Sequence, residues 1–173
     1  MFATIYLPNF YLQAVLRHQS ELCAKPVALL NEEDAKPVIL QLNQAAECAG
    51  VCKGMTPSQG LARSLHLVVK VRSRTQEKLL NEILLQHAFM LAPYVEATAA
   101  GICTVEFTDN RNLTDKVSRV IERLTDAEVI AQAGIASAPD TSFLAAHLAK
   151  PVLQIDDPRK FLAPLPIETL DLA

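Results

Sequence analysis

The order of strand-like and helix-like stretches from residue 67 onward limits the fold of this chain more than any other feature. These stretches follow one another as strand, helix, strand pair, helix, strand, helix, and a β-rich stretch at 2–7 precedes them. Because helices cover the apolar face of a sheet, the order predicts a mixed sheet backed by two or more helices, close to a ferredoxin-like α+β layer. The segment of about 11–66 then forms an insertion after the first strand, as a small second domain.

Two stretches carry this prediction most clearly. At 74–91, apolar side chains recur at three- and four-residue spacing, which is the pattern of an amphipathic helix. At 102–107, apolar and polar residues alternate, which indicates a strand with one buried face. The other elements expected here are strands at 67–71, 95–98 and 129–135, helices at 113–124 and 140–149, and an extended proline-rich tail at 161–166.

The insertion has its own local signals. Two apolar runs at 26–30 and 37–41 are joined by a turn-prone polar segment that contains Glu32, Glu33 and Asp34, so we expect a β-hairpin. Two short helices should follow, at 44–49 and 56–64. The first ends at a glycine, and the second begins with a capping threonine and a proline.

Composition excludes several classes of protein. The chain has 173 residues, a net charge of −3, 50% apolar residues and 20% charged residues, so it can bury a core and is not intrinsically disordered. It has no apolar run near the roughly 18 residues of a membrane helix, and no basic N-terminal region typical of a secretion signal. We therefore expect a cytoplasmic protein that does not bind nucleic acid over its whole surface.

The residues that could hold a metal do not form a metal-site pattern. Cys48 and Cys52 lie four apart, but Gly50 interrupts the helix and no second Cys or His pair follows. Since a structural zinc site needs four ligands, we interpret the two cysteines as small thiols and expect no metal and no cofactor. We interpret the dispersed histidines as packed or rim residues; they are His18, His66, His87 and His147.

Charged residues leave two interpretations open. The densest basic run comprises Lys70, Arg72, Arg74 and Lys78, and it is either a solvated strand exit and helix start or a surface that faces phosphates. Lys53 is a further candidate for contact with nucleic acid. The adjacent pair Asp156 and Asp157 lacks the rigid strand context of a two-metal site, so a solvated loop is the better interpretation.

Several segments together resemble the catalytic core of Y-family (translesion, DinB/UmuC-like) DNA polymerases. The most specific is 45–56, A-A-E-C-A-G-V-C-K-G-M-T, which resembles the fingers motif A-R-x-x-G-V-x-x-G-M. The K-P-V-A-L of 25–29 is similar to a K-P-V-A-V strand of the family. Three further segments follow in the same order as in the family: G-I-A at 134–136, A-K-P at 149–151 and A-P-L-P-I at 163–167. The last of these resembles the start of the thumb.

The resemblance implies a division of the chain into named domains. The palm would comprise residues 1–10 and 72–160, the fingers 11–71, and the truncated start of a thumb 161–173. This division agrees with the insertion inferred from the order of strands, which made no use of the family.

The metal ligands of the family are replaced at the matching positions. The family holds two metals with one carboxylate on the first strand and an adjacent Asp-Glu pair at a later strand start. Here the first position matches Tyr6, and the pair matches Gly101 and Ile102. Because two divalent cations need carboxylates to offset their charge, the resemblance implies a catalytically inactive site.

The nucleotide-binding positions are partly retained. Phe10 and Tyr11 match the aromatic pair of the family, with Tyr11 as the steric gate against ribonucleotides. Two triphosphate-binding positions match Gln44 and Glu47, and Glu47 would repel a triphosphate. Lys150, in the A-K-P segment, matches the third triphosphate-binding position and keeps its positive charge.

A Y-family scaffold with these replacements resembles the ImuB-like proteins. The resemblance implies a non-catalytic component of error-prone translesion synthesis in SOS mutagenesis and DNA repair, with weak binding to damaged or primed DNA. It also implies a sliding clamp and ImuA-like and DnaE2/ImuC-like proteins as partners, mainly through regions beyond the thumb, and no membrane.

Two alternatives remain open at this stage. The chain could be an active Y-family polymerase whose metal ligands are relocated to Glu106, Asp109 or Glu96. It could also be an α+β interaction domain unrelated to DNA.

Overall fold

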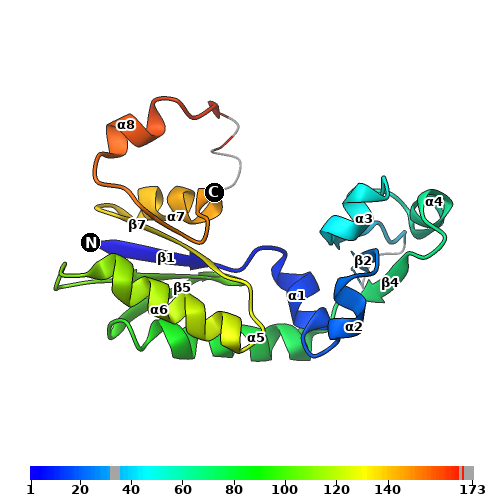
Figure 1. The fold of residues 1–173 in the computed structure, drawn as a ribbon, viewed down its shortest axis with the longest axis horizontal. Helices are drawn as coiled ribbons and strands as arrows, with labels where there is room; N and C mark the ends of the chain where they lie inside the picture. The colour runs from blue at the N-terminus through cyan, green and yellow to red at the C-terminus, as the bar shows by residue number, and fades with distance from the viewer. Residues whose placement is uncertain (32–35, 168, 170–173) are drawn as a thin grey trace. The chain divides into compact units, whose positions relative to one another are not determined.

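The computed structural model describes residues 1–31, 36–167 and 169, and for Ser20 the backbone alone. The chain forms two compact units (Figure 1). The first comprises Met1–Pro8 and Asn81–Ala173, and the second comprises Asn9–Leu80. The second unit is thus an insertion in the sequence of the first, directly after the N-terminal strand.

The first unit contains a five-stranded sheet with the order β5-β6-β1-β7-β8. The central strand β1 is antiparallel to both β6 and β7, while β7 and β8 are parallel. Apart from β8, this is the strand order of a ferredoxin-like layer. The strands are β1 (Phe2–Tyr6), β5 (Tyr94–Ala99), β6 (Ile102–Glu106), β7 (Gln132–Ala136) and β8 (Val152–Gln154).

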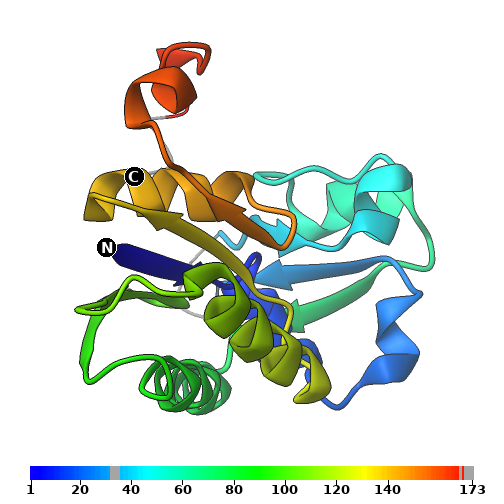
Figure 2. The same ribbon diagram turned by 60° about the vertical axis from the view of Figure 1, so that its left-hand side comes forward.

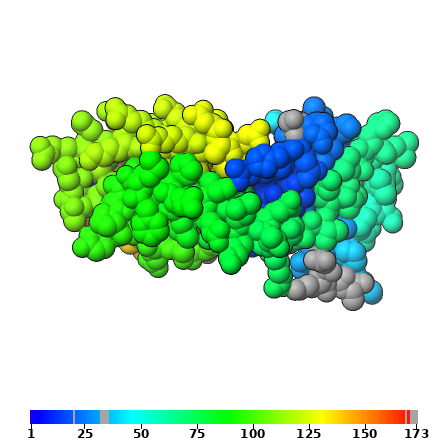
Figure 3. Space-filling view, turned by 90° about the horizontal axis from the view of Figure 1, so that it is seen from below, coloured from blue at the N-terminus to red at the C-terminus, as the bar shows by residue number. Residues whose placement is uncertain are grey.

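Helices lie on both faces of this sheet. Figures 1 and 2 show α6 (Leu113–Asp126) and α5 (Arg74–Ala88) on one face and α7 (Pro139–Leu148) on the other. Figure 3 shows the outer surface of α6 and of the later turns of α5. Because side chains alternate along a strand, Ala3 and Ile5 face α6 while Thr4 and Tyr6 face α7.

Helix α7 packs on the sheet at unusually short distance because β7 carries a glycine there. A Cβ atom placed on Gly134 would lie 2.2 Å from the backbone oxygen of Ser142 and 2.3 Å from the backbone nitrogen of Ala146. Only glycine leaves room for the helix backbone at this point.

The second unit has a three-stranded sheet with the order β3-β2-β4, in which β2 is antiparallel to β3 and parallel to β4. Strand β2 is buried on both faces: Ala28 and Leu30 belong to one apolar cluster, and Val27 and Leu29 to another. The strands are β2 (Val27–Leu30), β3 (Ile39–Leu42) and β4 (Val68–Val71). The helices are α1 (Phe10–Leu16), α2 (Ser20–Cys23), α3 (Gln44–Cys48) and α4 (Pro57–Arg63).

The fold class expected from the sequence is confirmed: a mixed sheet backed by helices, with a smaller α/β unit inserted after the first strand. The prediction of an extended tail at 161–166 is wrong for its first two residues, because helix α8 spans Pro158–Leu162. The carboxylate of Asp157 caps this helix by accepting hydrogen bonds from the backbone N–H groups of Arg159 and Lys160. The expected turn with Glu32, Glu33 and Asp34 lies outside the described residues.

Besides α8, two further short elements were not expected from the sequence, namely α2 and β8. Each is too short to show a periodic pattern. Within the described part of the chain, no helix has the length and apolar character needed to cross a lipid bilayer.

Candidate functional site

The three positions that match metal ligands of Y-family polymerases lie together in the first unit. Tyr6 ends β1 and is the direct cross-strand partner of Ile102, the first residue of β6. The backbone oxygen of Gly101 accepts a hydrogen bond from the backbone N–H of Leu7, with a distance of 2.9 Å between nitrogen and oxygen. The sequence placed these residues about a hundred positions apart, and the antiparallel pairing of β1 with β6 brings them together.

Tyr6 is packed into an aromatic stack on the α7 face of the sheet. Its ring lies 4.0 Å from the His147 ring, measured between centroids, and the two planes are inclined by 24°. The Phe143 ring lies 4.6 Å from that of His147. Nδ1 of His147 is 3.0 Å from the backbone oxygen of Phe143. Burial raises the pKa of the Tyr6 phenol, so the ring is neutral at physiological pH.

Gly101 has a backbone conformation that favours glycine. Its φ is 74°, in the left-handed region, and it is buried in the turn between β5 and β6. Its N–H donates to Oδ1 of Asn81 at 3.2 Å. An aspartate at this position would therefore carry backbone strain in addition to its charge.

These residues do not fit the divalent cations that polymerases of this fold use. Mg²⁺ takes oxygen ligands, above all carboxylates. Tyr6, Gly101 and Ile102 offer one neutral phenol, one hydrogen atom and one apolar side chain. Across the described ranges, no group of three or more His, Cys, Asp or Glu side chains is arranged to hold a metal ion.

The carboxylates considered as relocated ligands lie elsewhere. Glu106 is paired with Phe2, at the opposite end of β6 from Ile102, and Glu96 lies on the edge strand β5. Asp109 is exposed and accepts hydrogen bonds from the backbone and side chain of Arg111, which lower the pKa of its carboxyl group. The structure does not gather these carboxylates into one cluster.

A chain of hydroxyl groups runs beneath the stack and was not foreseen from the sequence. Oγ1 of Thr4 lies 2.8 Å from Oγ of Ser142 and 3.2 Å from Oγ1 of Thr104. Thr98 extends the chain, with Oγ1 3.0 Å from that of Thr104. Thr4 and Ser142 are fully buried, and the Ser142 hydroxyl donates to the backbone oxygen of Pro139 at 2.7 Å. The interior on this face is therefore polar but internally satisfied.

The second unit holds the retained aromatic pair. The rings of Phe10 and Tyr11 meet edge to face at 5.3 Å between centroids. The Arg72 guanidinium lies 3.8 Å above the Tyr11 ring centroid. Arg72 also donates two hydrogen bonds to the Glu77 carboxylate, from Nε at 2.8 Å and from a terminal nitrogen at 2.7 Å. Arg72 thus lies in an internal ion pair and cation–π contact.

The basic candidates differ in their surroundings. Nζ of Lys70 donates to Oε1 of Gln19 at 3.0 Å and is half-buried. Lys53 and Lys78 are exposed, and no salt bridge found among the described residues holds either of them. Arg74 is exposed at the start of α5. Neighbouring side chains therefore hold Lys70 and Arg72 of the expected basic run.

The remaining candidates for contact with a nucleotide are all exposed. Gln44 and Glu47 lie in the first turn of α3, whose N-cap Asn43 accepts a hydrogen bond from the backbone N–H of Ala46. Lys150 follows α7. Sequence reasoning missed the role of Glu77 as the partner of Arg72. The signal available was its place in the first turn of the helix that Arg72 precedes.

Comparisons with solved structures show the fold. The crystal structure of DinB from Sulfolobus solfataricus is similar with a TM-score of 0.83 at 14% identity, covering 97% of this chain and 52% of that chain. A post-insertion binary complex of Dbh DNA polymerase is similar with a TM-score of 0.85 at 16% identity, covering 97% of this chain and 52% of that chain. An insertion ternary complex of Dbh DNA polymerase has a TM-score of 0.85 at 14% identity, covering 97% of this chain and 53% of that chain. The chain shares the fold of Y-family polymerases and spans about half the length of these structures.

Sequence comparisons identify the family. No curated protein matches the chain. The family model described as impB/mucB/samB matches residues 5–147, which include the end of β1, the whole second unit and most of α7. The chain therefore belongs to the impB/mucB/samB family.

Proposed function

We propose that this chain is the palm and fingers of a non-catalytic Y-family polymerase homologue of the ImuB-like type. It acts in error-prone translesion synthesis as a DNA-binding or protein-binding component and does not add nucleotides. The observation that carries the proposal is the pairing of Tyr6 with Ile102 beside Gly101, at the positions that match metal ligands. Two-metal phosphoryl transfer needs carboxylates there, and a neutral phenol stacked on His147 cannot take their place.

Binding to DNA is the second part of this proposal. Its support is the similarity to binary and ternary complexes of Dbh DNA polymerase and the exposure of Lys53 and Lys78. The net charge of −3 makes strong binding by this chain alone unexpected. We place a sliding clamp and ImuA-like and DnaE2/ImuC-like proteins among its partners, on the resemblance to ImuB-like proteins.

Primer extension tests the catalytic part. The purified protein is incubated with primed template, all four deoxynucleotides and either Mg²⁺ or Mn²⁺, with Dbh polymerase as the positive control. We expect no extension with either metal. Metal-dependent extension that persists after repeated purification would contradict the proposal and favour relocated ligands among Glu96, Glu106 and Asp109.

Fluorescence anisotropy with a labelled primed template tests the DNA-binding part. We expect weak affinity that falls as salt rises, because contacts with phosphates release counterions. Replacing Lys53 and Lys78 by alanine should weaken binding and reduce the salt dependence by about two contacts. Binding that is unaffected by salt and by both substitutions would exclude Lys53 and Lys78 as DNA contacts.

A further inference from the structure

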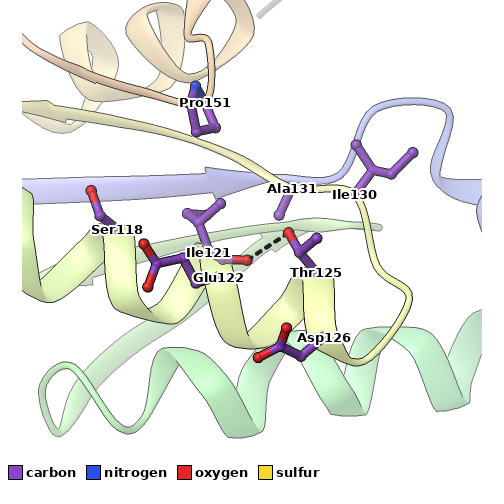
Figure 4. A pocket seen from close by; sticks show the side chains of 8 residues that line it. All are labelled: Ser118, Ile121, Glu122, Thr125, Asp126, Ile130, Ala131 and Pro151. Atoms are coloured by element: carbon purple, nitrogen blue, oxygen red, sulfur yellow. Dashed lines mark hydrogen bonds between the residues drawn. The ribbon is translucent and has the colours of Figure 1, made fainter.

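The first unit has a groove outside the region described so far. It has a volume of about 480 Å³ and lies between α6, the segment that leads into β7, and the residue before β8. Figure 4 shows the side chains that line it. They are Ser118, Ile121, Glu122, Thr125, Asp126, Ile130, Ala131 and Pro151.

The groove combines an apolar floor with acidic side chains. Ile121 is buried, whereas Ile130 at the edge is 66% exposed. Glu122 and Asp126 are exposed and lie one helical turn apart on α6, so they are neighbours on one helix face. The Thr125 hydroxyl donates to the backbone oxygen of Ile121 at 3.0 Å, as the dashed line in Figure 4 marks.

The negative charge of the groove is not balanced by its own lining. The lining contains two carboxylates and no basic side chain. Of the two arginines on α6, Arg123 donates to Sδ of Met90 at 3.5 Å, beyond the end of α5, and Arg119 is not among the lining residues. Among the described residues, no salt bridge holds Glu122 or Asp126. The groove therefore offers two carboxylates that no salt bridge among the described residues holds, beside apolar surface.

This combination selects one class of ligand. Phosphates of a nucleic acid would be repelled by both carboxylates. A short protein segment with an arginine or lysine next to an apolar side chain would match the charge of the groove and cover Ile130.

We propose that this groove binds a basic segment of a partner protein, with the cation between Glu122 and Asp126 and the adjacent apolar side chain against Ile130. This site is separate from the region around Tyr6, so the inference stands whether or not the chain binds DNA.

Peptide titration followed by nuclear magnetic resonance tests the proposal. The probe is a synthetic peptide of alternating leucine and arginine, and its matched partner carries citrulline in place of arginine. The arginine peptide should shift the backbone amide signals of residues 118–131 and bind more tightly than the citrulline peptide. The double variant Glu122→Gln/Asp126→Asn should weaken binding by about tenfold, because each exposed carboxylate contributes about a factor of three.

A matched control separates local contacts from net charge. Glu21→Gln/Glu82→Gln changes the charge equally at two exposed positions outside the groove and should leave binding unchanged. Ile130→Ser should weaken binding of both peptides. Equal weakening by the control pair, or shifts centred outside residues 118–131, would overturn the proposal. The same shifts on adding a single-stranded DNA oligonucleotide would also overturn it.

Discussion

Tyr6 and His147 stack face to face, with their ring centroids 4.0 Å apart, although one ends the central strand and the other lies in the last turn of α7. The contact joins the end of strand β1 to helix α7. The aromatic pair thus contributes to packing, and its removal should be measurable as a change in stability.

Removing either ring of this pair should destabilise the first unit. We expect Tyr6→Ala and His147→Ala each to lower the free energy of unfolding by about 1–3 kcal/mol, from lost burial and lost stacking. Their double-mutant cycle should give a coupling energy of about 0.5–1.5 kcal/mol, measured by urea denaturation. Tyr6→Phe keeps the ring and is the control. Additive single effects would mean that the stack contributes nothing beyond burial.

Alkaline pH should destabilise the protein through Cys103. Burial raises the pKa of this thiol from 9.0 to about 12. The unfolded chain therefore releases the thiol proton near pH 9, while the folded chain retains it up to about pH 12. The contribution of Cys103 to stability is complete below pH 9 and is lost as pH rises between these two values.

Urea denaturation at several pH values measures this effect. Between pH 8 and 10.5 the free energy of unfolding should fall by about 2 kcal/mol on account of Cys103. Cys103→Ala is less stable at every pH but should show a flatter pH dependence over this interval. Burial also raises the pKa of the Tyr6 phenol, so Tyr6 adds a further loss of stability above pH 10 in both proteins. Parallel pH profiles for the two proteins would contradict the prediction.

The Arg72–Glu77 pair should stabilise the second unit. The two side chains are only 25% and 11% exposed, so removing one leaves a partly buried charge without its partner. We expect Glu77→Ala and Arg72→Ala each to cost about 2–3 kcal/mol. The exposed ion pair of Arg111 with Asp109 is the comparison, and its disruption should have a much smaller effect on stability, because water screens both charges.

The Arg72–Glu77 pair also leads to a prediction about DNA binding by the basic run. Because Arg72 is held by Tyr11 and Glu77, its replacement should change stability more than DNA affinity. Anisotropy measured well below the denaturation temperature distinguishes the two effects. A large loss of DNA affinity in a fully folded Arg72→Ala protein would show that the pair opens to bind phosphate.

Gly134→Ala should be among the most damaging single substitutions. The added methyl group would lie 2.2 Å from a backbone oxygen of α7, and neither backbone can move without displacing the helix. We expect a loss of at least about 3 kcal/mol, seen as a lower denaturation midpoint. Gly54→Ala is a contrasting control, because nothing lies within 4 Å of its added Cβ and only its φ of 83° causes strain. An equal effect of both substitutions would argue against the close packing.

Sequence patterns were sufficient for the architecture because most elements have clear periodicity. Alternation around Cys103 and the spacing of Leu80 and Leu84 defined a strand and a helix, and their order defined the sheet with its insertion. The patterns failed at α8, where a proline-rich stretch was read as extended although Asp157 caps a helix. They also could not foresee contacts that join distant residues.

The candidate site was likewise only partly predictable from the sequence. Tyr6, Gly101 and Ile102 were selected by resemblance to a motif, and pairing of β1 with β6 brings them together. The stack on His147 depends on how α7 lies on the sheet, and no local pattern encodes that placement. The ion pair that holds Arg72 likewise depends on the path of the chain between β4 and α5.

The chain of hydroxyl groups from the exposed Thr98 through the buried Thr104 and Thr4 to Ser142 has a consequence for how the protein selects its fold. A slip of one residue between β1 and β6 would place Thr4 opposite an apolar neighbour and remove the hydrogen bond between the Thr4 and Thr104 hydroxyl groups. Competing alignments of these strands are therefore penalised, since they lose hydrogen bonds as well as apolar contacts. These hydroxyl groups therefore help to fix the register of the central strands of the sheet.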